Sequence, residues 1–283
     1  MFNFAGRNLK IYYRQKSAVF FSLLGVFIII GLYVVFLGDV WVTGFELPGK
    51  EVLMYSWIIA GIVSVSSITT AMGAFGSMVE DRERKNSKDF FSSPVKRSHI
   101  VGGYLLSAYI IGVTMSILSL ILGELYIFLN GGSLLSLTGM LKALIVILLS
   151  SAASSSFVFF IVSFFKNNNA FNTASTILGT LIGFLTGIYL PIGSLPEAVQ
   201  WLIKLFPVSH GAALMRQILM ETPIQSSFAD VPVEILMQFK VDLGIAYTYG
   251  NATAGAITHV LVLSGTAIIF FLLALINVSR ENK

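Results

Sequence analysis

The chain has 283 residues, of which 55% are hydrophobic and 11% are charged, whereas soluble globular domains carry roughly 25% charged residues. This composition excludes an ordinary soluble domain and indicates an integral membrane protein. The net charge of +4 is too small and too dispersed for nucleic-acid binding, and the absence of cysteine excludes disulfides, thiolate metal sites and a cysteine nucleophile.

Residues 1–16 carry basic side chains and precede an apolar stretch, an order that resembles a signal peptide. The apolar stretch is too long for a signal sequence, and no small-x-small cleavage site follows it. At about 100° per residue, Arg7, Lys10 and Arg14 fall on one face of a helix and apolar side chains fall on the other. We therefore predict an amphipathic helix that lies in the membrane interface, with a frayed tail as the alternative.

Six stretches are long and apolar enough to cross a membrane, which takes about 20 residues. They are Ser17–Leu37, Val52–Met78, His99–Leu129, Met140–Phe165, Ala170–Leu190 and Gly255–Val278. Turn signals at Asn130–Ser133 and Lys166–Asn169 separate the third, fourth and fifth stretches. We predict an all-α integral membrane protein with six transmembrane helices, which forms a single domain over residues 1–283.

The basic residues predict the orientation of these spans. Thirteen of the 18 lysines and arginines lie in the two terminal segments, in the loop of residues 79–98 and at Lys166. Because basic residues accumulate on the cytoplasmic side, both termini and this loop are predicted to be cytoplasmic.

The connection between the last two spans, residues 191–254, is too apolar in its first half for a plain loop. Two short apolar helices are expected on either side of Pro207, and each is too short to cross a membrane. Such segments are tolerated at membrane depth only where protein or water satisfies their backbone. We predict extracellular re-entrant helices, followed by a small exposed excursion over residues 221–254.

Catalytic motifs are missing from the sequence: there is no phosphate-binding loop, no H-E-x-x-H and no G-x-S-x-G. His99, His210 and His259 lie near predicted helix ends, where satisfied interfacial histidines are expected, with a ligand or a proton carrier as the alternative. Glu124 is the acid inside an apolar span, a position that often marks a functional group. Because Lys142 lies just beyond the following turn, we predict an ion pair between Glu124 and Lys142, with a substrate or proton site as the alternative.

Small residues gather in three of the predicted spans. The glycines among them are Gly73, Gly76, Gly179, Gly183 and Gly187. The last three recur every fourth residue, a spacing that lets two membrane helices approach closely. Ser150–Ser156 forms a similar small-residue run. Packing within the chain is one interpretation, and contact with a second subunit or a partly hydrated route is the other.

The run Glu80–Arg97 holds ten charged residues, although the whole chain has only 32. Ser87 suits the N-cap of a helix, Asp89 suits its first turn, and Pro94 would end it. The adjacent phenylalanines Phe90–Phe91 would need a surface to cover them on so polar a segment. We predict a short helix that docks into another protein, with insertion into the bilayer as the alternative.

Two segments carry a resemblance to a known family. They read VEDRERKNSKDFFSSPVKRSHIVGGYLLS and LPIGSLPEAVQWLIKLFPVSHGAALMRQIL. The first resembles the cytoplasmic loop of type-2 ABC exporter permeases. The second is similar to the segment after that family's fifth span, where a proline precedes a helix ending near an arginine. With the six-span layout, the resemblance covers essentially the whole chain. One departure is Asn86–Ser87 in place of Gly-Thr, and we expect Asn86 to supply the left-handed turn.

The resemblance implies a permease subunit that is not itself an enzyme and holds no cofactor. It implies two copies of a separate ABC ATPase carrying ATP and magnesium, and a second permease copy in a homodimer or a heterodimer. The loop helix, about Ser87–Ser93, would be the coupling helix that enters the ATPase. The second and fifth spans would line the dimer interface and the route. The residues implied in the ATPase contact are Glu80, Asp81, Arg82, Glu83, Arg84, Ser87, Lys88, Asp89, Phe90, Phe91 and Pro94.

The cargo is predicted from what the spans contain. Few charges are buried, which argues against small ions, while apolar spans with Ser and Thr patches favour a drug, an antimicrobial peptide or a lipid-like molecule. An exporter of polysaccharide or lipid-linked glycan is an alternative. An intramembrane enzyme is an alternative of another class, for which only Glu124 offers a polar group.

Overall fold

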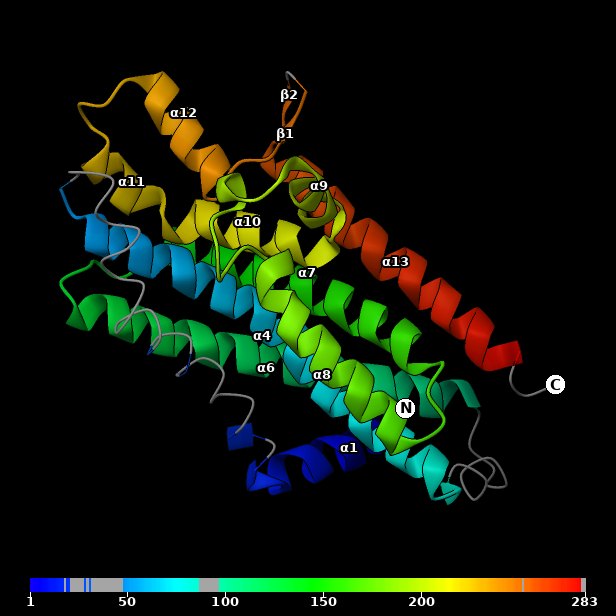
Figure 1. Cartoon of the computed structure of the whole chain (residues 1–283). Helices are drawn as coiled ribbons and strands as arrows, with labels where there is room; N and C mark the ends of the chain where they lie inside the picture. Colours follow the sequence, from blue (N-terminus) through cyan, green and yellow to red (C-terminus); the bar gives the residue numbers. More distant parts are fainter. Residues whose placement is uncertain are drawn as a thin grey trace.

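The computed structural model describes residues 1–17, 19–20, 28, 31, 48–86, 97–250 and 252–280. The described residues form ten α-helices, one 3-10 turn and one two-stranded hairpin (Figure 1). Of the described residues, 81% are helical, in agreement with the predicted all-α class. Most of the predicted first span, Ser17–Leu37, and all of the predicted loop helix, Ser87–Ser93, lie outside the described residues.

Four of the described helices have the length and apolar composition to cross a membrane. They are α4 (Lys50–Glu83), α6 (Arg97–Leu129), α7 (Leu137–Val162) and α13 (Ala256–Arg280). These helices coincide with the second, third, fourth and sixth predicted spans. The six-span count itself stays a prediction, because most of the first span lies outside the described residues and the fifth differs.

The fifth predicted span, Ala170–Leu190, is wrong at its C-terminal end, because α8 covers Asn168–Leu185. Gly187 has a left-handed φ of +66°, and the Ile188 N–H donates back to the Gly183 carbonyl at 2.9 Å. This hydrogen bond, with the glycine at that position, is the Schellman ending of a helix. With 18 residues, α8 is about 27 Å long, slightly less than the hydrocarbon thickness.

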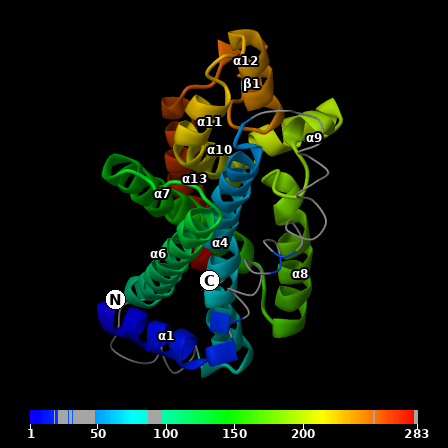
Figure 2. The same ribbon diagram turned by 90° about the vertical axis from the view of Figure 1, so that its left-hand side faces the viewer.

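Helix α4 lies at the centre of the bundle. It packs against α6, α7, α8 and α10, and Figure 2 shows it between α6 and α8. In α4, 89% of the apolar window is buried within the protein, whereas in α13 only 22% is. Small and apolar residues all around α4 allow this central position, because a helix without a polar face can be covered on every side. In α13 the apolar residues face outward, as expected of a helix that contacts lipid.

The two ends of the bundle differ in content (Figures 1 and 2). Helix α1 (Phe2–Arg14) lies at one end, together with the last turns of α4 and α13, and we call this the terminal end. The opposite end carries residues 192–253, and we call it the cap end. The elements of the cap are η2 (Ile192–Ser194), α9 (Glu197–Leu205), α10 (Pro207–Leu219), α11 (Glu221–Ser227), α12 (Val233–Asp242), β1 (Thr248–Tyr249) and β2 (Ala252–Thr253).

The two short helices predicted around Pro207 are α9 and α10. Pro207 occupies the first turn of α10, where its missing N–H breaks no helical hydrogen bond. Helix α10 inserts among α4, α7 and α13, and Val208–Arg216 is buried. The predicted exposed excursion, residues 221–254, contains α11, α12 and the hairpin, in which Thr248 pairs with Thr253.

Candidate functional site

A buried carboxylate at the terminal end joins three helices. Asp81, on α4, is 5% exposed and forms a two-pronged ion pair with Arg7 of α1, at 2.9 and 3.0 Å. The Tyr104 hydroxyl of α6 donates to the same carboxylate at 2.6 Å, and the Asn86 side-chain amide donates at 3.2 Å. Paired arginine–carboxylate hydrogen bonds are among the stronger ones in proteins because both partners are charged. This cluster therefore fastens α1 and α6 to the end of α4.

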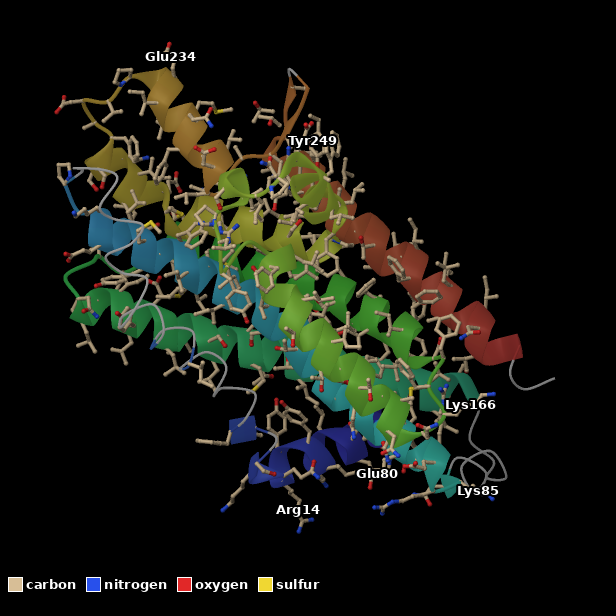
Figure 3. All side chains as sticks on the ribbon, in the orientation of Figure 1. Arg14, Glu80, Lys85, Lys166, Glu234 and Tyr249 are labelled. Atoms are coloured by element: carbon tan, nitrogen blue, oxygen red, sulfur yellow. The ribbon has the colours of Figure 1, made fainter. Side chains whose placement is uncertain are left out.

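Helix α1 packs on the bundle through Ala5, Asn8 and Tyr12, which lie on or beside its apolar face. Arg7 belongs to the Asp81 cluster, and the hydrogen bond with this carboxylate raises the pKa of Arg7. Lys10 and Arg14 are exposed, as Figure 3 shows for Arg14. Of the three predicted basic residues, Arg7 is thus bound to Asp81 within the chain, whereas Lys10 and Arg14 are exposed.

A second set of contacts ties α4 to α7, α8 and α13. The Arg82 guanidinium donates to the Ser163 and Phe165 carbonyls at 3.2 and 3.1 Å, just after the end of α7. The last carbonyls of a helix lack helical partners, and a cation there also complements the helix dipole. The Ser163 hydroxyl accepts from Asn277 of α13 at 2.6 Å. Glu83 accepts a hydrogen bond from the Asn168 side-chain amide at the start of α8.

These contacts leave fewer charged side chains free for the predicted contact with an ATPase. Asp81, Arg82 and Glu83 are engaged within the chain, whereas Glu80 and Arg84 form an exposed pair at 2.7 Å. The other predicted contact residues, 87–94, lie outside the described residues.

The turn after α4 also differs from the prediction. Lys85, not Asn86, takes the left-handed conformation, with a φ of 61°. Asn86 instead uses its side chain to donate to Asp81. The expectation for Asn86 rested on backbone preference alone, and the nearby carboxylate offers its amide a better partner.

A groove of about 610 Å³ runs between α1, α4 and α8. Its lining mixes hydroxyls and amides with apolar side chains, and includes Thr69, Met72, Ser77, Phe171, Asn172, Ser175 and Leu178. Three of the predicted glycines border it. Gly73 and Gly76 lie on α4, and at Gly179 of α8 an added Cβ would meet no described atom within 4 Å. Gly179 therefore leaves room in the groove, whereas Gly76 lies against the Phe171 ring.

Gly183 and Gly187 have another use. The Tyr189 ring lies directly on Gly183, where an added Cβ would overlap it. Gly187 ends α8 through its left-handed backbone. For these two glycines the structure fits the interpretation of packing within the chain.

The run Ser150–Ser156 packs against other helices of the same chain. Ser154 and Ser67 of α4 share a hydrogen bond of 2.9 Å between their hydroxyls. Gly211 of α10 lies against Ser150 so closely that a Cβ there would displace it. The interpretation as packing within the chain therefore fits this run.

A buried arginine connects the cap to the end of α8. The Arg216 side chain of α10 is 0% exposed and donates to the Thr186 and Gly187 carbonyls at 3.0 and 2.9 Å. Its guanidinium also lies over the Trp57 ring of α4, 4.9 Å from the centroid. Burial lowers the pKa of Arg216 to about 10. From the sequence, Arg216 is not predicted as a site residue, although an arginine near the end of this helix is part of the family resemblance.

Two histidines far apart in sequence meet inside the cap end. The Nδ1 atoms of His210 and His259 are 2.8 Å apart, and His210 Nε2 lies 2.8 Å from the Lys204 carbonyl. Because a carbonyl only accepts, Nε2 of His210 must carry the proton, and neutral His210 therefore accepts at Nδ1. His259 then donates from Nδ1, which leaves its buried Nε2 with a lone pair and no partner among the described residues. The prediction of a satisfied histidine is thus wrong for His259.

This pair predicts acid sensitivity. Burial lowers the pKa of His210 below its ordinary value of 6.5, so the unfolded chain binds a proton at a higher pH than the folded chain does. Folding stability should therefore fall as the pH drops below 6.5, by up to about 1.4 kcal/mol per pH unit and proton, until the folded pair also takes up a proton.

The measurement is thermal unfolding of the purified chain between about pH 7.5 and pH 5.5. The double variant His210→Gln/His259→Asn keeps similar hydrogen-bond donors without titrating, and should lose much of the pH dependence. His99→Gln, at an exposed position, is the matched control and should behave like the parent. If the parent and the double variant had equal pH dependence, the histidine pair would not be the cause of the acid sensitivity.

The predicted ion pair of Glu124 with Lys142, both described, is not formed. The Glu124 carboxylate is 7% exposed and accepts the Leu135 backbone N–H at 2.8 Å, which holds the loop between α6 and α7. Lys142 faces α11 instead, with its Nζ 3.9 Å from a Glu221 oxygen. Within the described ranges, no group of three or more potential ligands could hold a metal ion.

Comparison with known proteins places most of this bundle in one family. Residues 42–276 match the family model described as ABC-2 family transporter protein. The matched range begins before α4 and reaches into the last turns of α13, so it includes the whole cap. No curated protein matches the chain.

Proposed function

The chain belongs to the ABC-2 transporter family, and on this basis we propose that it is the membrane permease subunit of an exporter powered by a separate ATPase. The family match confirms the resemblance found in the sequence, and such permeases are transport subunits rather than enzymes. The match over residues 42–276 is the observation that carries the proposal.

We place the ATPase at the terminal end. Figure 3 shows Arg14, Lys85 and Lys166 at this end, whereas Glu234 and Tyr249 lie at the cap end. An excess of basic residues marks the cytoplasmic side of a membrane protein, and an ATPase has access to ATP there. Two ATPase copies, each with ATP and magnesium, would face the loop of residues 79–98 in a homodimer of this chain.

The Asp81 cluster supports the transmission of movement from this loop. The last turn of α4, which leads into the loop, is fastened to its neighbours by three charged side chains. Asp81 binds α1 and α6, Arg82 binds the end of α7, and Glu83 binds α8. A displacement of the loop by the ATPase would therefore move α4 together with its neighbours. Coupling of this kind requires an element with two arrangements that both sites influence.

The groove between α1, α4 and α8 supports an amphipathic cargo. Its volume of about 610 Å³ lies within the usual range of small-molecule sites. Because hydroxyls, amides and apolar side chains share its lining, a molecule with both polar and apolar parts fits it better than an ion. We propose a drug, an antimicrobial peptide or a lipid-like molecule as cargo, with the second permease copy closing the open side near Gly179.

The coupling loop is tested by placing charge on its apolar pair. The double variant Phe90→Asp/Phe91→Asp should weaken ATPase binding by about 30-fold or more, because buried aromatic residues often dominate the energy of an interface. The measurement is the amount of ATPase retained on the tagged chain, together with ATP-driven transport in proteoliposomes.

The matched control is Ser92→Asp/Ser93→Asp, which adds the same charge nearby and leaves both phenylalanines in place. It should retain most of the binding. If the phenylalanine variant bound its ATPase and transported as the parent does, the coupling role of this loop would be excluded.

A further inference from the structure

A second cavity, which we call the cleft, opens at the cap end, away from the groove between α1, α4 and α8. It has a volume of about 720 Å³ and lies between α7, α10, α11, α12 and the start of α13. Its floor is formed by buried apolar side chains, namely Val146, Leu214, Ile218, Ile224 and Ile245. Its rim is polar, with Lys142, Gln217, Glu221, Gln225 and Lys240. An apolar floor beneath a charged rim suits an amphiphile.

The rim is positively charged overall, with two lysines and one glutamate. Lys142 lies 3.9 Å from Glu221, and both side chains are more than half exposed, so water weakens this pair. The Lys240 ammonium has no hydrogen bond or ion pair among the described residues, although its backbone carbonyl accepts from Ile245 and Ala246. At least one cation is therefore available to an anionic group in the cleft.

The cleft continues onto surfaces that face the bilayer. Helices α7 and α13 pack together, both begin at the cap end, and both qualify as membrane spans. Next to the cleft, Ile145 of α7 is 62% exposed, and Ile257 and Leu261 of α13 are 76% and 65% exposed. A molecule in the cleft can therefore extend an aliphatic chain along these two helices without leaving the hydrocarbon.

We propose that this cleft binds one anionic phospholipid, with the phosphate between Lys142 and Lys240 and the acyl chains along α7 and α13. Lysine side chains lay their methylene stems on apolar surface and hold the ammonium at the level of lipid head groups. The inference depends on the long helices crossing a membrane, and not on the ATPase. Its failure would leave the proposed export function unaffected.

The experiment is a lipid titration of the full-length, delipidated chain, followed by native mass spectrometry. Phosphatidylglycerol is the anionic probe, and phosphatidylcholine with the same acyl chains is the comparison. The parent should prefer phosphatidylglycerol. The double variant Lys142→Gln/Lys240→Gln should bind it about tenfold more weakly, since each basic side chain near a membrane surface adds a modest attraction. Lys50→Gln, which removes a lysine of the cap end outside the cleft, should bind like the parent.

A second variant separates the cleft from general surface charge. Ala256→Trp would fill the exposed mouth of the cleft without changing its charge, and should reduce the binding of both lipids. Glycerol phosphate, which lacks acyl chains, should not displace the bound lipid. Equal affinity of the parent for the two lipids would overturn the proposal. So would undiminished phosphatidylglycerol binding in the double variant, or displacement of the lipid by glycerol phosphate.

Discussion

Replacing Asp81 by alanine is expected to lower the free energy of unfolding by about 2 kcal/mol, through the loss of the cluster at the terminal end. The substitution removes the acceptor of Arg7, Tyr104 and Asn86 at once. Removing one partner of a buried pair leaves the other charge uncompensated, and this costs about 3–5 kcal/mol when both are fully buried. The Arg7 side chain is 35% exposed, so water compensates part of its charge and the lower figure applies.

The measurement is unfolding of the purified chain in mixed micelles with increasing dodecyl sulfate, followed by tryptophan fluorescence. Glu80→Ala is the matched control, because it removes a neighbouring carboxylate whose partner, Arg84, is exposed. It should change the free energy by less than about 0.5 kcal/mol. If the alanine variants at both positions were equally stable, Asp81 would not hold the helices together.

Replacing Arg216 by alanine is expected to cost about 3 kcal/mol of unfolding free energy. The substitution leaves the Thr186 and Gly187 carbonyls without their donor and opens a cavity beside Trp57. Arg216→Lys should recover only part of the loss, because an ammonium can replace the Nη2 hydrogen bonds to the two carbonyls but cannot lie flat on the indole ring. Arg84→Ala, at an exposed position, is the control and should be nearly neutral.

The neutral variant Arg216→Met separates the hydrogen bonds of the arginine from the volume that its side chain fills. Burying a guanidinium without a carboxylate is itself unfavourable, so methionine relieves that cost while it fills most of the volume. We expect Arg216→Met to remain less stable than the parent, by the same unfolding measurement, because the two carbonyls stay unpaired. A methionine variant as stable as the parent would show that the hydrogen bonds of Arg216 do not hold α8 to the cap.

The sequence predicts the long helices well, because their existence depends on local composition. Helices α4, α6, α7 and α13 lie where an apolar run reaches membrane length. The end of α8 was missed because Gly187 was interpreted by its spacing from Gly179 and Gly183. A glycine just after a helix is also a stop signal, and this competing interpretation is the one that the structure bears out.

The polar contacts are much harder to predict, because they depend on how the helices rotate against one another. Asp81 and Arg7 are 74 positions apart, and His210 and His259 are 49 apart. No local pattern places such pairs together. Proximity across a turn was also misleading for Glu124, because the Leu135 N–H in the loop was a nearer partner than Lys142.

The central claim is that this chain is the permease of a transporter whose energy comes from another subunit. The most direct test is affinity purification of the full-length chain from its native membrane, followed by measurement of bound subunits and ATP hydrolysis. We predict that an ABC ATPase is recovered with it, in one copy per permease chain, and that the purified complex hydrolyses ATP. A folded chain that is recovered intact from gentle lipid-disc extraction, with no nucleotide-hydrolysing partner, would contradict the claim.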